Sequence, residues 1–173
     1  MRCALLILSL LFFSCAQDPE IIASEHFYFS RPADSADVRT AEDSAAKGHY
    51  ILRLDSSHKF GFSFARPLQE KDLEKRLIVT YKAKIRKNHI YSAGSMVIVL
   101  SHHDKVTHWR PNNLNRHIAD LGRWNWFYDS LSLPKSTKEE PYNTITVQGL
   151  LGDAVNESFD FDSVSVYVKG LDR

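Results

Sequence analysis

The stretch that decides the fold is Leu77-Ile78-Val79-Thr80-Tyr81-Lys82-Ala83-Lys84-Ile85-Arg86. Its apolar side chains recur at every second position, and the opposite face ends in three basic residues, Lys82, Lys84 and Arg86. A period of two is typical of a half-buried antiparallel strand, with one face in the core and the other toward solvent. We therefore expect Tyr81 to be buried and Lys82 to be exposed.

The same period continues on both sides of this stretch. Alternating apolar residues recur in 50–54, 60–64, 96–100 and 145–147, and the connectors between them are rich in Asp, Asn, Ser and Pro. Residues 69–76 allow one exposed helical turn at most, and one further short strand is expected around Val38. Many short strands with polar connectors predict an all-β sandwich or barrel with little or no helix.

Composition narrows the class of protein. The chain has 173 residues, of which 43% are hydrophobic and 25% charged, which is close to the average of globular domains. Lys and Arg number 22 against 21 Asp and Glu. This balance argues against a dedicated nucleic-acid binder, because such a domain is usually strongly basic.

The N-terminal residues have the pattern of a targeting segment. Arg2 precedes the apolar run Cys3–Phe13, which is too short to span a bilayer but suits a signal peptide. We predict a signal peptide over 1–14, a tether over 15–24 and a folded domain over 25–173. Without the leader the chain keeps one cysteine, Cys15, which has no intramolecular disulfide partner.

The segment Leu11-Phe12-Phe13-Ser14-Cys15 resembles a bacterial lipobox. The resemblance implies that the leader is cut before Cys15 and that this cysteine carries acyl chains, including palmitate. It places the protein in the bacterial cell envelope, anchored to a membrane on the periplasmic side or at the cell surface. The alternatives are an ordinary secretory peptide cut near Ala16, or a loose membrane helix.

Six motifs follow one another along the chain: Ala45 to Leu54, Leu77 to Ile85, Thr107-His108-Trp109, Gly122-Arg123-Trp124, Leu131-Ser132-Leu133-Pro134, and Phe159 to Val166. By the order of these motifs, residues 48–170 resemble the jelly-roll β-sandwich of carbohydrate-binding modules, the galactose-binding-domain-like fold. The resemblance implies a two-sheet antiparallel jelly roll, a non-catalytic role, and a polysaccharide or oligosaccharide as partner.

Aromatic residues near 126 are the first candidates for a ligand site. Trp124, Trp126 and Tyr128 share one face of a predicted strand, whereas Phe127, Leu131 and Leu133 share the other. If the Phe127 face points inward, Trp126 and Tyr128 form an exposed platform on which a sugar ring can stack. Otherwise the tryptophans are core, or the strand is buried on both faces. His102 or Arg110 is expected to add polar contacts from a neighbouring loop.

Metal and cofactor signals are weak. His102 and His103 point to opposite sides of a strand, so solvated loop histidines are the better interpretation of the run that ends at His108, and we expect neither a metal nor a cofactor. The carbohydrate-binding-module resemblance implies a structural calcium near Asp160 or Asp162, with Glu20 or Glu25 as a further ligand; the alternative is that both aspartates are surface carboxylates.

Three functions remain open. The sequence has no G-x-S-x-G, H-E-x-x-H, P-loop or G-x-G-x-x-G motif, so an enzyme with a dispersed active site is the least favoured and we expect no catalytic residues. The favoured function is a membrane-anchored, non-catalytic binding module for a glycan. The alternative is a structural or assembly lipoprotein that contacts another envelope protein.

Overall fold

A computed structural model describes residues 19–29, 40–43, 48–90, 93–152 and 158–171. The predicted signal peptide, the lipid site at Cys15 and the short strand around Val38 lie outside these residues. Within them, no helix is long and apolar enough to cross a membrane.

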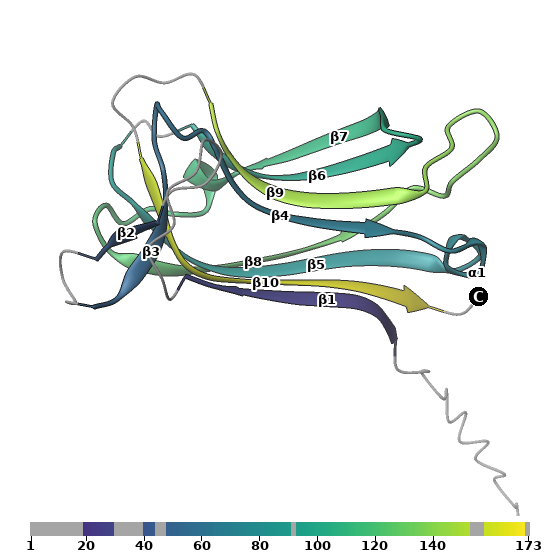
Figure 1. Ribbon diagram of the computed structural model, residues 1–173, viewed down its shortest axis with the longest axis horizontal. Coiled ribbons are helices and arrows are strands. Elements are labelled where there is room, and N and C mark those ends of the chain that lie inside the picture. The colour runs from purple at the N-terminus through teal and green to yellow at the C-terminus, as the bar shows by residue number, and fades with distance from the viewer. Residues whose placement is uncertain (1–18, 30–39, 44–47, 91–92, 153–157, 172–173) are drawn as a thin grey trace, which may run out of the picture.

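The chain forms two packed β-sheets, which Figure 1 shows as two layers seen edge-on. All pairings between the strands are antiparallel, so the predicted two-sheet antiparallel sandwich is confirmed. The six-stranded sheet contains β1 (Glu20–Tyr28), β2 (Thr40–Glu42), β3 (Tyr50–Leu54), β5 (Arg76–Lys87), β8 (Trp124–Ser132) and β10 (Phe159–Leu171). The four-stranded sheet contains β4 (Phe60–Pro67), β6 (Gly94–His102), β7 (Lys105–Asn113) and β9 (Thr144–Leu151).

Strand order fixes which side chains become neighbours. The six-stranded sheet runs β2-β3-β10-β5-β8, with β1 also paired to β10, and the four-stranded sheet runs β4-β9-β6-β7. Strand β8 is therefore an edge of its sheet. The single turn of α1 (Glu70–Leu73) and the 3₁₀ turn η1 (Leu114–Arg116) complete the fold, which agrees with the one helical turn predicted within 69–76.

The core lies between the two sheets and follows the predicted alternation. Tyr81 on β5 is 1% exposed, whereas Lys82 is exposed, as expected from the period of two. Phe62 of one sheet meets Phe161 of the other with ring centroids 5.9 Å apart. At Gly94 the layers are so close that an added Cβ would lie 2.3 Å from the ring of Phe159, so only glycine fits there.

Strand β1 begins earlier than the predicted domain boundary at residue 25. It takes up residues 20–24, which the sequence had assigned to the tether. The physical reason is packing, because Ile22 and Ala23 lie against the core cluster while Lys75 forms an ion pair with Glu20. The folded domain therefore includes the first half of β1.

Candidate functional site

The outer face of β8 carries two exposed aromatic side chains. Trp126 is 61% exposed and Tyr128 is 65% exposed, whereas Phe127 between them is 3% exposed and belongs to the core. Of the alternatives left open by the sequence, the Phe127 face is the inner one. Side chains two residues apart on a strand lie on the same side, about 7 Å apart, so Trp126 and Tyr128 stand next to each other; we call this pair the β8 platform.

Basic side chains from β5 lie against these aromatic rings. Lys82 Nζ is 4.2 Å from the ring centroid of Trp126. Lys84 Nζ is 5.4 Å, and the guanidinium carbon of Arg86 is 4.6 Å, from the ring of Trp124. A cation over an indole face is attracted by its quadrupole, so these contacts hold the two tryptophan rings in defined positions before any ligand arrives.

A second aromatic group lies on the other side of the same face. His26 and Tyr28 of β1 stack with centroids 6.4 Å apart, and the ring of Tyr167 on β10 meets His26 edge-on at 5.4 Å. His26 Nδ1 also lies 2.9 Å from the hydroxyl of Ser165. The register places Ser165 directly between His26 and Lys82. The face therefore has aromatic side chains at both sides, with Ser165 and Lys82 between them, over about 14 Å across four strands.

A hollow of about 240 Å³ opens at one end of this face. Its walls come from three separate parts of the chain: Tyr28, Phe29, Gly48, His49, Tyr50 and Asp162. A register shift between Phe161 and Ser163 bends β10 here, and such bulges re-aim side chains. Asp162 binds His49 Nε2 at 2.8 Å and Lys84 Nζ at 2.6 Å. The hollow thus offers aromatic rings beside a carboxylate and an imidazole, groups that suit hydroxyl-rich ligands.

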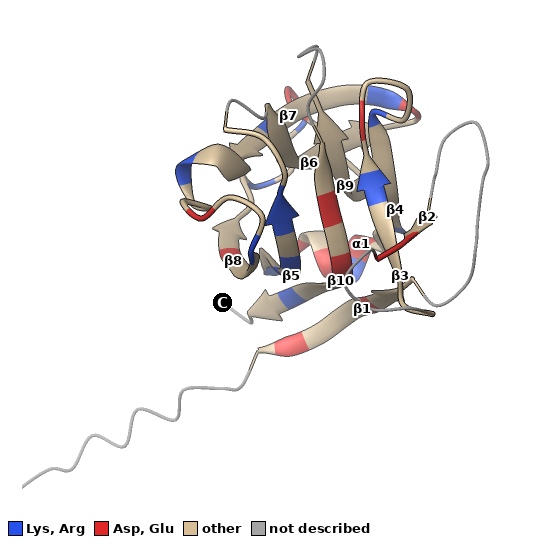
Figure 2. Cartoon of the chain, turned by 90° about the vertical axis from the view of Figure 1, so that its left-hand side faces the viewer, with Lys and Arg blue, Asp and Glu red and all other residues tan. Residues whose placement is uncertain are grey.

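An ionic cluster, centred on a buried aspartate, lies on the outer face of the six-stranded sheet where β3, β10 and β5 pair. Arg53 and Arg86 flank Asp160, which is fully buried; Arg53 Nε donates at 2.7 Å and Arg86 donates at 2.8 and 3.0 Å. Arg86 also reaches Asp43 at 3.1 Å, and the Asn88 amide donates to Asp160 at 2.9 Å. Figure 2 shows the basic segment of β5 beside the acidic residues of β10. Two cations and two carboxylates make the cluster neutral.

The pKa shifts in this cluster follow from its charges. Burial alone lowers the pKa of Arg86, but hydrogen bonds and attraction from Asp160 and Asp43 outweigh it and raise the pKa. For Arg53 the hydrogen bond to Asp160 is the largest cause, and the pKa is again raised. These arginines are therefore locked in the charged state, and the cluster is a permanent structural element.

The two aspartates on β10 both have basic partners but differ in burial: Asp160 is fully buried, so it is not a surface carboxylate, whereas Asp162 is half-buried. Asp160 is occupied by two arginines, and Asp162 by His49 and Lys84. Across the described residues, no group of three His, Cys, Asp or Glu side chains is placed to hold a metal ion. The basic residues predicted on the solvent-facing side of β5 do not share one environment, because Lys82 is exposed whereas Arg86 is 8% exposed.

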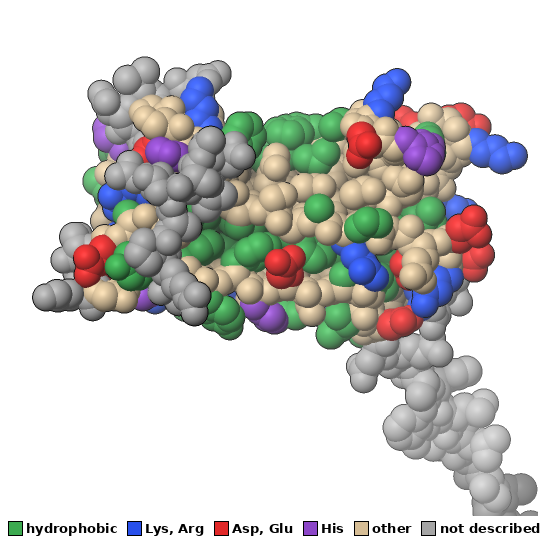
Figure 3. All heavy atoms as spheres, viewed as in Figure 1, with side chains coloured by type: hydrophobic (Ala, Val, Ile, Leu, Met, Phe, Trp, Pro, Cys, Tyr) green, Lys and Arg blue, Asp and Glu red, His purple; other side chains and the backbone are tan. Residues whose placement is uncertain are grey.

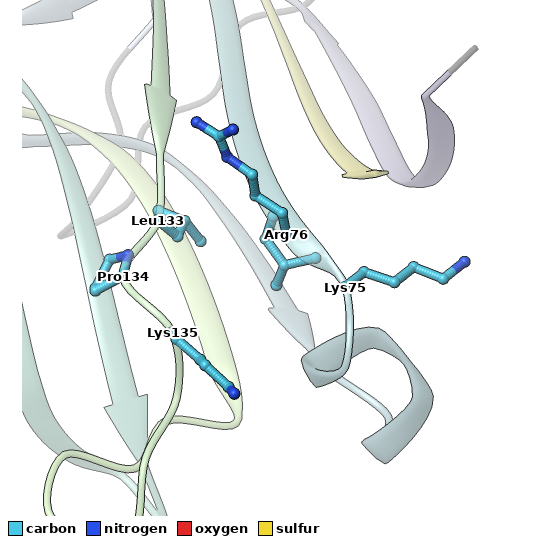
Figure 4. Close-up of a pocket in the computed structure, with 6 residues that line it drawn as sticks. Lys75, Arg76, Leu133, Pro134 and Lys135 are labelled. Carbon is cyan, nitrogen blue, oxygen red and sulfur yellow. The ribbon is translucent and has the colours of Figure 1, made fainter. Parts of the chain in front are cut away.

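A second cavity, of about 250 Å³, lies at the opposite end of the sheet. It is lined by Lys75, Arg76, Leu77, Leu133, Pro134 and Lys135. Figure 4 shows that its three charged side chains point in different directions. The ammonium of Lys75 pairs with Glu20, and Arg76 Nε donates to the Ser132 hydroxyl at 3.2 Å. Because the polar groups do not converge, we do not assign a ligand to this cavity.

His102 and Arg110 are not brought to the β8 platform. His102 ends β6 and Arg110 lies on β7, both in the four-stranded sheet, whereas Trp126 and Tyr128 are on the outer face of the other sheet. The ring of His102 instead contacts that of His103 at 4.1 Å. The prediction that these residues share a ligand with the platform assumed loop proximity, which the sheet assignment does not support.

Sequence reasoning missed the second aromatic group and the hollow. Ser24, His26 and Tyr28 are exposed at every second position, and Ala23 and Phe27 beside them are half-buried, although Glu25 is exposed as well. This pattern lies where the sequence had predicted a tether and the first residues of the domain. Tyr167 follows the same period on β10. The alternation was a usable signal for which residues face outward, but not for β1 lying beside β10.

Comparison with known proteins finds no matching family model and no matching curated protein. Among solved structures, the CBM22-1 xylan-binding domain of Paenibacillus barcinonensis Xyn10C is 10% identical, with a TM-score of 0.48, covering 89% of this chain and 97% of that one. A structure described as CBM4 is 15% identical, with a TM-score of 0.44, covering 76% and 77%.

A cyclase from Fischerella sp. TAU, in complex with 4-(1H-indol-3-yl)butan-2-one, is 12% identical, with a TM-score of 0.45, covering 84% of this chain and 74% of that one. These similarities are weak, with identities of 10–15% and TM-scores of 0.44–0.48. The function of this chain is therefore inferred from its own side chains.

Proposed function

We propose that this protein is a non-catalytic binding module that holds a glycan on the outer face of its six-stranded sheet, and that it is anchored to a membrane of the bacterial envelope through Cys15. The observation that carries the glycan proposal is the β8 platform. Trp126 and Tyr128 are large, exposed and adjacent on one strand. Sugar rings present CH groups that pack on aromatic faces, while a tyrosine hydroxyl supplies a hydrogen bond.

The rings are also held in place, which favours binding. Lys82 lies over Trp126, and Arg86, fixed by two buried carboxylates, lies over Trp124. A side chain that is already ordered loses less conformational entropy when a ligand binds. Preorganised aromatic rings on a rigid sheet therefore suit a repetitive ligand that presents CH faces for packing, such as a saccharide chain.

A non-catalytic role is supported by the state of the titratable groups. Asp160, Asp43 and Arg86 are buried in a neutral cluster that half-buried Arg53 completes through its ion pair with Asp160. The carboxylate in the hollow, Asp162, is bound on both oxygens. A general acid or base needs an accessible group with a pKa near the working pH, and these paired groups serve structure instead.

A glycan array with residues 16–173, which keep every described residue, tests the proposal. Trp126→Ala is expected to abolish binding while the melting temperature stays within about 2 °C of wild type, since the side chain is mostly exposed. Trp109→Ala is the matched control, because Trp109 is 48% exposed but lies on the four-stranded sheet. An equal loss of glycan binding in both variants, or unfolding of Trp126→Ala, contradicts the proposal that the β8 platform binds the glycan.

The anchor proposal rests on the lipobox resemblance and on the short chain length between Cys15 and the first strand. Cys15 precedes Glu20 by five positions in the sequence, so the acylated cysteine lies within about 17 Å of the start of β1. That start is at the end of the sandwich that carries α1 and the C-terminus (Figure 1). The hollow is at the other end of β1, about 26 Å away. The anchor would thus leave the binding face clear of the membrane.

Metabolic labelling with palmitate tests the anchor. Wild-type protein is expected to incorporate label and to partition into detergent, and Cys15→Ser is expected to lose both properties while the domain still folds. The stable anchoring of two or three acyl chains explains the difference. Equal labelling of the Cys15→Ser variant overturns this part of the proposal.

One observation favours the alternative, a structural lipoprotein that contacts another envelope protein. The central rows of the outer face of the four-stranded sheet are uncharged: Ser63–Gln148–Val97–Pro111 and Ala65–Thr146–Val99–Trp109. Uncharged faces with an exposed tryptophan are common at protein contacts. If Trp109→Glu abolishes co-purification of an envelope protein while no glycan binds the wild type, this alternative replaces the glycan module.

A further inference from the structure

We propose that the glycan is acidic, and that a carboxylate on the sugar pairs with Lys82 while the ring of the same sugar packs on Trp126 and Tyr128. This inference rests on the proposed glycan-binding function and names the class of ligand. It comes from the charges of the outer face and from the position of one lysine among the aromatic rings.

The outer face carries an excess of positive charge. From the row of Lys84 to the row of Ile78, its described residues include three lysines, Lys82, Lys84 and Lys169, and a single carboxylate, Asp162 at the bulge. Lys84 and His49 already satisfy the oxygens of Asp162. Lys82 and Lys169 therefore remain without an ion-pair partner on the described part of the chain, and a ligand of opposite charge is favoured there.

The free charge lies where the sugar would bind. Lys82 is the direct cross-strand partner of Tyr128, and its Nζ is 4.2 Å from the ring centroid of Trp126. Direct partners have Cβ atoms about 5 Å apart. A carboxylate on a ring packed against either aromatic side chain is thus within reach of the ammonium, with no change in the backbone.

The same lysine discriminates against a neutral sugar. Its ammonium lies over the Trp126 indole. A sugar ring that packs beside this contact leaves it in place, and an acidic sugar then adds a charge-assisted hydrogen bond to the ammonium. A neutral sugar gains no such bond, so selectivity comes from this one attractive group.

Paired polysaccharides test this inference: polygalacturonate, alginate and a glucuronoxylan, each beside its carboxyl-reduced form. Wild-type protein, residues 16–173, is expected to bind at least one acidic form about tenfold or more tightly than its reduced form, with an affinity that falls as salt rises. Lys82→Met keeps the length of the side chain and removes its charge, and it is expected to bring the acidic form down to the affinity of the reduced one.

Lys105→Met is the matched control, since Lys105 is an exposed lysine on the four-stranded sheet and should leave the preference unchanged. Equal binding of acidic and reduced forms, or an unchanged preference in Lys82→Met, overturns the acidic-glycan inference and leaves the platform in place. Binding of neither form, together with a glycan array on which nothing binds, overturns the glycan proposal itself.

Discussion

Two cross-strand rows of the same sheet face have opposite environments. One row reads Arg53–Asp160–Arg86–Trp124 and the other His26–Ser165–Lys82–Tyr128. Arg86 and Lys82 are four residues apart on β5 and point to the same side. Yet Asp160 and Arg86 are buried, whereas Lys82, His26 and Tyr128 are exposed.

The neighbours across β10 explain the difference. In the first row β10 pairs with β3, and Asp43, which follows β2, closes over Arg86. In the second row β10 pairs with β1, and the face stays open (Figure 1). Buried charges have to be paired, whereas exposed lysines keep their ammonium in water. The closed row therefore serves stability, and the open row is available for a ligand.

The largest expected effect is at the centre of the closed row. Asp160→Asn leaves Arg53 without its strongest partner and Arg86 with only Asp43, and we expect unfolding to become easier by about 3–5 kcal/mol. Urea unfolding followed by tryptophan fluorescence measures this. Asp162→Asn, a less buried aspartate on the same strand, is the control and should cost about 1 kcal/mol or less. Similar costs for both variants contradict the distinction between the rows.

Trp124 joins the two regions and should give an intermediate effect. It is half-buried and lies 4.6 Å from the Arg86 guanidinium at the edge of the closed row. Trp124→Ala is expected to cost about 1–2 kcal/mol, through lost apolar burial and one cation–π contact. Trp124→Phe keeps an aromatic ring and should recover part of the lost stability, as measured by urea unfolding. If Trp124→Phe is as unstable as Trp124→Ala, the loss does not come from ring burial or from the cation–π contact.

A smaller effect on stability, which depends on pH, is expected at Asp55, next to the strand β3 that contributes Arg53 to the closed row. Backbone N–H groups of Ser57 and His58 each donate to Asp55 Oδ1 at 2.9 Å. Burial alone raises the pKa of this carboxyl, but those bonds outweigh it and hold the pKa below the ordinary 3.8. A lowered pKa means stabilisation that is present above the unfolded value and is lost as pH falls through the folded value.

Asp55→Asn should therefore cost about 1 kcal/mol at neutral pH and progressively less below about pH 4. Thermal unfolding of both proteins between pH 7 and pH 3 measures the difference. A cost that stays constant down to pH 3 shows that the charge of Asp55 does not matter for folding.

The smallest effect on stability is expected in the open row. Lys82→Met removes an exposed charge and should change the free energy of unfolding by less than about 0.5 kcal/mol, by the general behaviour of surface substitutions. Chemical unfolding of the same preparation that is used for the binding measurements provides the check. A large loss of stability in Lys82→Met makes the open row structural as well, and removes the contrast between the two rows.

Much of the strand structure was accessible from the sequence. The period of two in Leu77–Arg86 predicted β5, its buried Tyr81 and its exposed Lys82, because alternation is a local property of an extended chain. The two faces of β8 were also separated correctly, but the sequence left open which of them was inner. That choice needed β5, whose Ala83 lies opposite Phe127 and turns the ring into the core.

Other features depended on contacts between residues far apart in the chain. His26 lies beside Tyr167 only because β1 pairs with β10, 141 residues away in sequence. His102 and Arg110 were expected near the platform, yet the chain passes to the other sheet after β5. No local pattern records which strand becomes the neighbour of which.

The sequence by itself determined β5 and other strands of clear alternation, their polar and apolar faces, and the presence of aromatic side chains with the spacing of a platform. Only the tertiary structure decided which outward side chains are covered. Lys82 and Arg86 follow the same alternation, but a segment more than 40 residues earlier buries one of them and not the other. Alternation is set by backbone geometry within a strand, whereas burial is set by whatever the rest of the chain lays over it.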